Sequence, residues 1–358
     1  MRLRTQLGSF VGTIAAISLV AGCSGGGSQL PSAAPQGGNG QTTQSVTMRG
    51  PLNHTGTSLA ARNTGANRKV QHLGSWFIPN HNPITSQVFV GDSTNSVVEI
   101  FDFKTRTQTG QIGGLNAPEG LTTDSAGNLY ESDTGTNQIL VFKSPYTGSP
   151  RAIADPSGYP VGNHVDGNGD LWVANICSTA SGCAGGGAVL KYTGAKGTPT
   201  SLKNAPYRTY FVTTDANGNV WADGQNSSGS AVIGYWKAGA GSFKTVAISL
   251  VFPGSLQFDK AGNLLLVDQS GDPTTGGSIM NIYPPGSTTP SGSIILQTTG
   301  DDVISAALGT AQARIFAPLY LTGTSGIISY PAGAMVNTLT PTTIGNPDAV
   351  AVTPSTLP

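Results

Sequence analysis

The feature that most constrains the fold is an internal repeat in the middle of the chain. Four copies share an Asp, a Gly three residues later and then Asn or Asp; they begin at Asp124, Asp166, Asp215 and Asp259, at spacings of 42, 49 and 44 residues. In each copy a short apolar strand ends at the Asp, whose carboxylate can cap a turn, and the Gly supplies the positive φ of a tight hairpin. A β-prone strand follows. The repeat therefore predicts one hairpin-containing unit that recurs along the chain.

Each unit has room for four strands. The hairpin is followed by an apolar run such as residues 138–142, then by a Pro/Gly turn and a fourth short run. Four strands in 42 to 49 residues is the period of a β-propeller blade. A parallel βαβ arrangement needs helices of about ten or more residues with a 3.6-residue apolar period, and the sequence contains no such segment. We therefore expect an all-β protein made of four-stranded antiparallel blades.

The two ends of the repeat region complement each other. Residues 87–92 resemble strand two of a blade with no strand one before them, and residues 314–321 match a blade whose hairpin pattern has decayed. The tail at 346–352 resembles the strand-one segment at 117–123. A C-terminal strand that completes the first blade would close the ring and leave no unpaired sheet edge. The prediction is a six-bladed β-propeller formed by residues 70–358.

The repeat resembles a known family. The run Asp133-Thr-Gly-Thr-Asn137-Gln-Ile-Leu-Val-Phe142 is similar to the NHL repeat of β-propellers, and residues 92–101 are a second good copy. The resemblance extends over roughly residues 84–353. It implies the fold but is nearly silent on function, because propellers host unrelated activities. The copies depart from the repeat at 175–187 and 223–230, where lengthened loops could carry an individual function.

The N-terminus has the pattern of a secretory signal. Basic residues 1–4 precede an apolar run at 7–21, which is shorter than the roughly twenty residues of a membrane-spanning helix. The run ends in Ala21-Gly22-Cys23, which resembles the lipobox of bacterial lipoproteins. That resemblance implies a signal peptide over residues 1–22, lipidation of Cys23 and, because Ser24 follows, sorting to the outer membrane or cell surface. The alternative is an ordinary signal peptide with an incidental cysteine.

The segment after the signal is expected to be a tether. Residues 23–69 are rich in Gly, Ser, Pro, Gln, Asn and Thr and contain few large apolar groups that could offset the entropy of ordering. A flexible coil of this length spans roughly 35 to 40 Å. The sequence therefore predicts a monomeric body held to the membrane of the bacterial cell envelope by a lipid anchor.

Composition excludes one class of partner and pairs two cysteines. The 18 Lys and Arg are balanced by 18 Asp and Glu, so the chain has no surplus positive charge to neutralise nucleic-acid phosphates. With Cys23 used as the anchor, Cys177 and Cys183 remain in an oxidising compartment and are expected to form a disulfide. A metal site is the weaker alternative, because no second Cys or His cluster would complete it.

Few ionisable or amide side chains are expected near the mouth of the central channel. Strand one of each blade lines the channel in such folds, which gives the candidates Glu119, Asn163, His164, Arg208, Asp302 and Asp348. The chain is distantly similar to the gluconolactonase and streptogramin lyase propellers, and this resemblance implies that some of these residues surround a divalent ion. Glu119, Asp302 and Asp348 could then hold Ca²⁺ or Mg²⁺.

We favour the simpler interpretation, in which these polar residues are hydrated at the channel mouth and bind no metal ion. The position of Glu119 is occupied by Val161, Tyr210 and Gly254 in the aligned copies, so the blades do not contribute ligands at one height. His164 is expected to be a hydrogen-bonded structural histidine. No Ser/His/Asp triad can be assembled, and we assign no catalytic residue.

Two further sets of residues have a structural and a functional interpretation. Asp or Asn recurs after strand two, and capping of the loops is favoured over a ring of metal ligands for Asp92, Asp133, Asn175, Asp223 and Asp268. Among the aromatic residues, Trp172 and Trp221 are expected in the core between blades. Exposed aromatics that could stack on a glycan are Tyr207, Tyr210 and Trp236.

The expected function is binding. Three features of the sequence, namely the expected lipid anchor, the long tether and the lack of a complete catalytic set, predict a non-enzymatic module. Its loop face would bind a protein, peptide or glycan. The alternative from another class is a metal-dependent lactone hydrolase or lyase at the channel mouth. A purely structural envelope protein is the third hypothesis.

Overall fold

The computed structural model describes residues 73–78, 86–181, 183, 185–297 and 302–353. The predicted signal peptide at 1–22, the predicted lipidation site Cys23 and the predicted tether at 23–69 lie outside the described residues. No helix among the described residues is long and apolar enough to cross a membrane.

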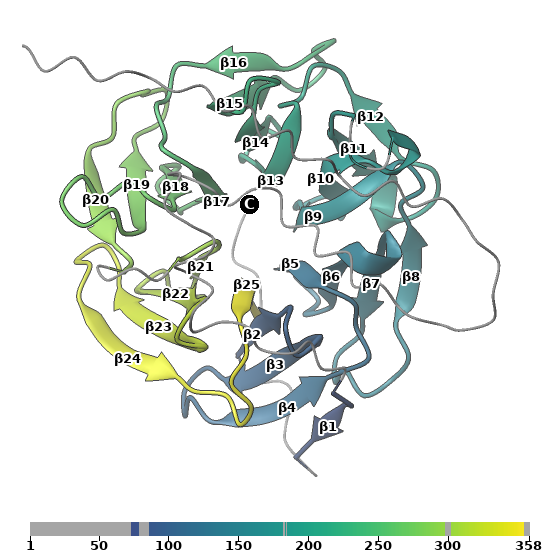
Figure 1. The fold of residues 1–358 in the computed structure, drawn as a ribbon, viewed down its shortest axis with the longest axis vertical. Coiled ribbons are helices and arrows are strands. Elements are labelled where there is room, and N and C mark those ends of the chain that lie inside the picture. The colour runs from purple at the N-terminus through teal and green to yellow at the C-terminus, as the bar shows by residue number, and fades with distance from the viewer. Residues whose placement is uncertain (1–72, 79–85, 182, 184, 298–301, 354–358) are drawn as a thin grey trace, which may run out of the picture. The chain divides into compact units, whose positions relative to one another are not determined.

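Six antiparallel sheets are arranged around a central axis, which confirms the predicted six-bladed β-propeller (Figure 1). Blade 2 consists of β5 (Pro118–Thr123), β6 (Leu129–Asp133), β7 (Gln138–Phe142) and β8 (Arg151–Ala154). Blade 3 consists of β9 (Gly158–Val165), β10 (Leu171–Ser178), β11 (Ala188–Tyr192) and β12 (Thr200–Leu202). Blade 4 consists of β13 (Arg208–Thr214), β14 (Val220–Gln225), β15 (Ala231–Trp236) and β16 (Lys244–Val246).

The remaining blades follow the same order from the axis outward. Blade 5 consists of β17 (Pro253–Phe258), β18 (Leu264–Asp268), β19 (Ile279–Tyr283) and β20 (Gly292–Ile295). Blade 6 consists of β21 (Ala307–Leu308), β22 (Arg314–Leu319), β23 (Thr324–Ser329) and β24 (Met335–Leu339). Three short 3-10 turns occur in blades 2 and 3, namely η1 (Thr134–Thr136), η2 (Thr179–Ser181) and η3 (Thr193–Ala195).

Blade 1 contains both ends of the described chain. Its strands are β25 (Pro347–Thr353), β2 (Gln87–Asp92), β3 (Val97–Asp102), β4 (Gln108–Ile112) and β1 (Trp76–Phe77), from the axis outward. The C-terminal β25 pairs with β2 from Gln87 opposite Thr353 to Asp92 opposite Pro347, so the predicted ring closure is confirmed. The short outer strand β1 was not predicted.

The hairpin between strands one and two has the geometry that the repeat requires. In blade 2 the Asp124 carboxylate accepts the backbone N–H groups of Ala126 and Asn128 at 3.0 and 2.8 Å. The same pair of bonds recurs in blades 3, 4 and 5. The turn glycines have φ between 73° and 79°, and they are Gly127, Gly169, Gly218 and Gly262. The capping role of the repeated Asp is therefore confirmed.

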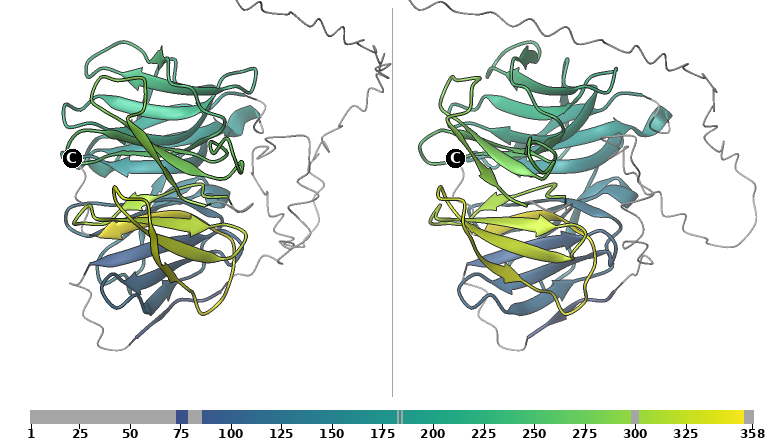
Figure 2. Two further views of the ribbon diagram at one scale, coloured as in Figure 1. Left: turned by 90° about the vertical axis from the view of Figure 1, so that its left-hand side faces the viewer. Right: turned by 60° about the vertical axis from the view of Figure 1, so that its left-hand side comes forward.

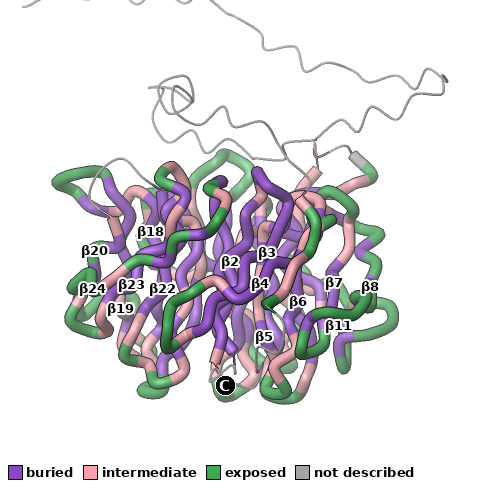
Figure 3. The backbone as a smooth tube through the Cα atoms, turned by 90° about the horizontal axis from the view of Figure 1, so that it is seen from below, coloured by how far each residue is buried: buried purple, intermediate pink, exposed green. Residues whose placement is uncertain are grey.

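The hydrophobic core lies mainly between adjacent blades. For example, Phe89, Ile100 and Ala351 of blade 1 pack against Leu129 and Leu140 of blade 2. Figure 2 shows the ring of blades from the side. In Figure 3 the inner strands are buried, and exposed residues concentrate at the turns and the outer strands. We call the side that carries the turns between strands one and two the hairpin face. The loop face is the opposite side, where strand one begins and the loops between strands two and three lie.

Candidate functional site: the channel and the loop face

A β-bulge recurs where strand one begins at the loop face. The pairing of strands one and two shifts register at this end in blades 1 to 5. In blade 2 the register passes from Pro118 to Gly120, so Glu119 is the extra residue of the bulge, and Asp348 is the extra residue in blade 1. A bulge turns the extra residue out of the regular alternation of side chains. Two of the candidate channel-mouth residues therefore lie at a backbone irregularity that the sequence did not reveal.

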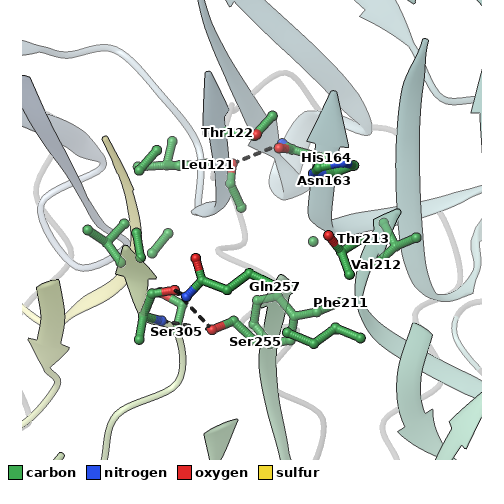
Figure 4. Close-up of a pocket in the computed structure, with 18 of the residues that line it drawn as sticks. Leu121, Thr122, Asn163, His164, Phe211, Val212, Thr213, Ser255, Gln257 and Ser305 are labelled. Atoms are coloured by element: carbon green, nitrogen blue, oxygen red, sulfur yellow. Dashed lines mark hydrogen bonds between the residues drawn. The ribbon is translucent and has the colours of Figure 1, made fainter. Parts of the chain in front are cut away.

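The central channel is narrow. The strand-one segments of the six blades enclose a cavity of about 80 Å³. Ligand pockets usually measure roughly 300 to 1,000 Å³, so this space suits a few water molecules and no larger substrate. Its polar lining consists mainly of uncharged groups, of which Figure 4 shows Asn163, His164, Thr213, Gln257 and Ser305.

Several polar side chains of the channel bind the neighbouring blade. Asn163 Nδ2 in blade 3 donates to Gly120 O at 3.1 Å and to Ser132 Oγ at 2.8 Å in blade 2. In blade 5 the Gln257 side chain donates to Ala306 O at 3.0 Å and accepts from Leu308 N at 3.1 Å in blade 6. These bonds from Asn163 and Gln257 hold adjacent blades together.

His164 belongs to the same set of contacts. Its Nε2 lies 2.9 Å from Thr214 Oγ1 in blade 4, and the side chain is buried. Burial lowers the pKa of His164 to about 4, and nearby Asp166 raises it by a smaller amount. The imidazole is therefore neutral at physiological pH, as expected of a structural histidine.

We expect the low pKa of His164 to make the fold sensitive to acid. An unfolded histidine takes up a proton below about pH 6.5, whereas the folded one stays neutral until about pH 4, so the unfolded state binds more protons between these values. The contribution of His164 to the free energy of unfolding should therefore fall as the pH drops through this window, by roughly 3 kcal/mol in total. His164→Gln keeps a polar partner for Thr214 and should remove this dependence, as measured by urea unfolding at pH 7, 5.5 and 4. Parallel curves for the two proteins would contradict the assignment.

The candidate carboxylates do not form a metal-binding cluster. Glu119 is half-buried, while Asp302 and Asp348 are buried. Among the described residues there is no group of three or more His, Cys, Asp and Glu side chains arranged to hold a metal ion. The three residues named for a Ca²⁺ or Mg²⁺ site are thus not gathered at one point of the channel mouth.

Arg208 is directed to the disulfide loop. Its guanidinium donates to Cys183 Sγ at 3.2 Å and to Cys183 O at 3.1 Å. The predicted disulfide is present and joins Cys177 near the end of β10 to Cys183 in the lengthened loop before β11. On the other side, the Arg208 guanidinium lies 5.8 Å from the ring centre of Tyr207. Arg208 therefore braces this loop at the loop face.

Removing the disulfide should weaken the fold only locally. Cys177 and Cys183 are six residues apart, and the chain-entropy model gives roughly 2 kcal/mol for so short a closed loop. A protein with both cysteines replaced by alanine should unfold cooperatively at a lower temperature, with unchanged far-UV circular dichroism. Complete loss of the folded state would show that the disulfide has a larger role than this argument gives it.

Loop capping is confirmed for three of the recurring strand-end acids. Asp133 accepts Asn116 N at 2.6 Å, Asp268 accepts Phe252 N at 2.9 Å, and Asp92 accepts Asn346 N at 3.1 Å. Each bond fixes the backbone just before strand one of the same blade, so these aspartates position the entry into the channel.

Asp223 is not equivalent to these residues, which corrects the sequence alignment. It pairs with Ile233 one step before the end-of-strand position, and Gly224 occupies the place that Asp133 has in blade 2. Its Oδ1 accepts Phe211 N at 2.9 Å, but its Oδ2 is buried without a hydrogen-bond partner among the described residues. Burial raises the pKa of Asp223 well above its ordinary value.

Two buried glutamates were missed by sequence reasoning. Glu99 in β3 and Glu131 in β6 are 2% and 0% exposed. Burial raises the pKa of both far above the ordinary range, and the nearby Asp92 and Asp133 raise it further. The available signal was a Glu inside an otherwise buried strand, which the repeat pattern alone does not distinguish from a solvent-facing one.

The loop face carries one exposed aromatic and one exposed apolar side chain, and the aromatic one contacts the disulfide loop. Tyr207 is 37% exposed in the connection before β13, and Val251 is 59% exposed in the connection before β17. The Tyr207 ring packs close to Gly186 of the disulfide loop, where an added Cβ would lie 3.0 Å from it. Beneath them Tyr210 and Phe252 stack with ring centres 5.6 Å apart. We call Tyr207, Arg208 and Val251 the loop-face patch.

Comparisons with known proteins identify the fold alone. No protein-family model matches the chain, and no curated protein matches its sequence. A chain in the crystal structure of a nidogen/laminin complex has a TM-score of 0.59 at 14% identity, covering 75% of this chain and 98% of that chain. A protein of unknown function from Bacteroides caccae has a TM-score of 0.57 at 13% identity, covering 76% and 100%. A streptogramin B lyase structure has a TM-score of 0.47 at 17% identity, covering 65% and 72%.

Proposed function

We propose that the protein is a non-enzymatic binding propeller that engages a protein or peptide partner through the loop-face patch. The observation that carries the proposal is the disulfide loop, which is closed by Cys177–Cys183, braced by Arg208 and flanked by exposed Tyr207. Tyr and Arg are enriched among the residues that dominate protein interfaces. A loop already held in place loses little conformational entropy on binding.

The channel supports binding over catalysis. Its cavity of about 80 Å³ is lined by side chains that bind the adjacent blades, such as Asn163 and Gln257. A general base or nucleophile needs a reactive atom within reach of a substrate. A chain with a similar fold occurs in the crystal structure of a nidogen/laminin complex, so such a propeller can take part in a protein complex. It supports the choice of a protein partner over a glycan.

The proposal places the propeller at the bacterial cell surface or outer membrane. The support is the lipobox-like Ala21-Gly22-Cys23 and the polar segment at 23–69. Mass spectrometry of the protein from its native membrane should find fatty acyl groups on an N-terminal Cys23. A mature N-terminus elsewhere, or an unmodified Cys23, would remove this part of the proposal.

The binding surface can be tested by photo-crosslinking in the native envelope. We compare the wild type with the Tyr207→Ser/Val251→Ser variant, and use Met335→Ser/Val336→Ser as the control because these residues of β24 are 48% and 43% exposed. Wild type and control should yield the same crosslinked partner, and the loop-face variant should yield at least tenfold less. Equal recovery by all three proteins would show that the partner binds elsewhere.

The metal-dependent alternative has its own test. We would measure the metal content of the purified protein and its melting temperature with EDTA or with added Ca²⁺ or Mg²⁺. Stoichiometric metal whose stabilising effect disappears in Glu119→Gln or Asp348→Asn would support a lactonase-like or lyase-like enzyme and count against the binding proposal.

A further inference from the structure

A larger cavity lies away from the channel, between blades 4 and 5 on the hairpin face. These blades are neighbours around the ring (Figure 1). The cavity measures about 770 Å³, within the range of small-molecule sites. Trp221 and Tyr235 line it from blade 4, and Phe258, Lys260 and Ser287 line it from blade 5.

The cavity has an aromatic wall. Trp221 in β14 is directly opposite Tyr235 in β15, so both side chains project from the same face of blade 4, and their ring centres are 4.8 Å apart. Phe258 of blade 5 meets the Trp221 ring edge-on at 6.1 Å. Both Trp221 and Tyr235 are only partly buried. The wall therefore presents an aromatic surface to whatever enters the cavity.

The indole N–H of Trp221 has no acceptor among the described residues, although it is buried. Its counterpart in blade 3, Trp172, donates to Asp166 Oδ2 at 3.0 Å. In blade 4 the corresponding oxygen of Asp215 accepts Asn219 Nδ2 at 2.8 Å instead. Blade 3 has an aspartate, which has no donor, where blade 4 has Asn219. Trp221 therefore has an unpaired indole donor where Trp172 has a paired one, and a buried donor without an acceptor is unfavourable.

Neighbouring clefts are closed by contacts that this one lacks. Between blades 2 and 3, Arg151 donates to Ala195 O at 3.0 Å. Between blades 5 and 6, Tyr330 donates to Asp259 Oδ2 at 2.6 Å. In the described structure no hydrogen bond joins residues 215–221 of blade 4 to the turns of blade 5 that line this cavity.

The charges at the cavity disfavour an anion. Its lining includes the carboxylates of Asp215 and Asp259 and the single cation Lys260. The oxygens of both carboxylates already accept bonds from their own turns, for example from Asn219 N and Asn263 N. The remaining polar rim is provided by uncharged groups such as Asn217 and Ser287. An uncharged ligand with several hydroxyl groups fits this lining better than a phosphate or carboxylate.

We propose that this cavity binds an uncharged hexopyranose or N-acetylhexosamine unit of a saccharide. The apolar face of the sugar ring would pack on the wall formed by Trp221 and Tyr235. Uncharged rim groups such as Asn217 and Ser287 would form hydrogen bonds with its hydroxyl groups. The site is separate from the loop-face patch and does not depend on it.

The test uses the full chain labelled with 5-fluorotryptophan. The protein has four Trp, so four fluorine signals are expected, and the signal lost in Trp221→Phe assigns the one that matters. The probes are maltose, cellobiose, lactose, mannobiose and N,N′-diacetylchitobiose. At least one should shift the Trp221 signal saturably and leave the Trp172 signal in place. Calorimetry should show about tenfold weaker binding of that sugar to Trp221→Phe, whose smaller ring offers less surface for the sugar to pack on. Trp172→Phe is the matched control and should bind like the wild type.

Three results would overturn the proposal. One is the absence of a Trp221 shift with all five sugars. Another is equal affinity of Trp221→Phe and the wild type for a sugar that binds. The third is a Trp221 shift with adenosine or indole but with no sugar, which would assign the cavity to flat aromatic ligands. Thermal melting of Trp221→Phe checks that its fold is intact.

Discussion

A chain that ends at residue 346 is expected to lose cooperative unfolding altogether. The deletion removes β25, in which all seven residues from Pro347 to Thr353 are buried. Burying one valine stabilises a fold by roughly 1.5 to 3 kcal/mol. The combined stabilisation from Val350, Val352 and the hydrogen bonds to β2 is therefore comparable to the whole free energy of unfolding of a domain, roughly 5 to 15 kcal/mol. The edge of β2 would also be left open to pairing with other chains. Calorimetry and size-exclusion chromatography should show aggregated protein without a melting transition.

The outer strand of the same blade provides the control. A chain that begins at residue 79 loses β1, whose two residues are half-buried and pair only with β4. We expect it to melt cooperatively, a few degrees below the full-length protein. Similar melting of both truncated proteins would mean that ring closure contributes little, contrary to the argument above.

Most of the fold could be predicted from the sequence because the repeat is a local signal. The Asp and Gly of each hairpin act on their own turn, so a pattern such as that at Asp124 and Gly127 specifies a turn without knowledge of the rest of the chain. Ring closure by β25 could be inferred because blade 1 lacks strand one in the sequence. The β1 strand could not, since two half-buried residues have no measurable periodicity.

The site was less predictable because it depends on register and on distant contacts. A bulge moves Glu119 out of the strand ladder. Asp223 lies one residue before the position of Asp133 in blade 2, so it is a buried acid and not a cap of the loop before strand one. The disulfide followed from cysteine count and compartment. Arg208 was placed near the channel mouth, but its partner is Cys183. The unpaired donor of Trp221 becomes apparent only when blade 4 is compared with blade 3, where Trp172 donates to Asp166.

Glu131→Leu is expected to stabilise the protein at pH 7 by roughly 3 kcal/mol. Glu131 lies opposite Leu121 in β5 and Leu140 in β7, within the apolar cluster between blades 1 and 2. Neither of its carboxylate oxygens has a hydrogen-bond partner among the described residues. An unpaired buried polar group destabilises a fold by about 1 to 3 kcal/mol, and a leucine of similar size should pack in its place.

The pH dependence identifies the cause. Burial raises the pKa of Glu131 well above its ordinary value, with a further contribution from Asp133, so the folded protein keeps a proton that the unfolded chain releases above about pH 4.3. The native state then binds more protons, and the free energy of unfolding falls as the pH rises, by about 1.4 kcal/mol per pH unit until the folded pKa is reached. Urea unfolding at several pH values should show the advantage of Glu131→Leu growing from pH 4 upward.

Two variants separate this contribution from the others. Glu131→Gln removes the titration but retains a buried polar group, so its stability should be independent of pH relative to Glu131→Leu and lie below it. His164 changes the stability in the opposite direction between pH 4 and 6.5, since its folded pKa is lowered to about 4. The two slopes oppose each other in the wild type, so Glu131→Leu should uncover a loss of stability on acidification that His164→Gln abolishes. If the curves of Glu131→Leu and the wild type stay parallel from pH 4 to 8, the carboxyl is ionised in the folded protein and has a polar partner.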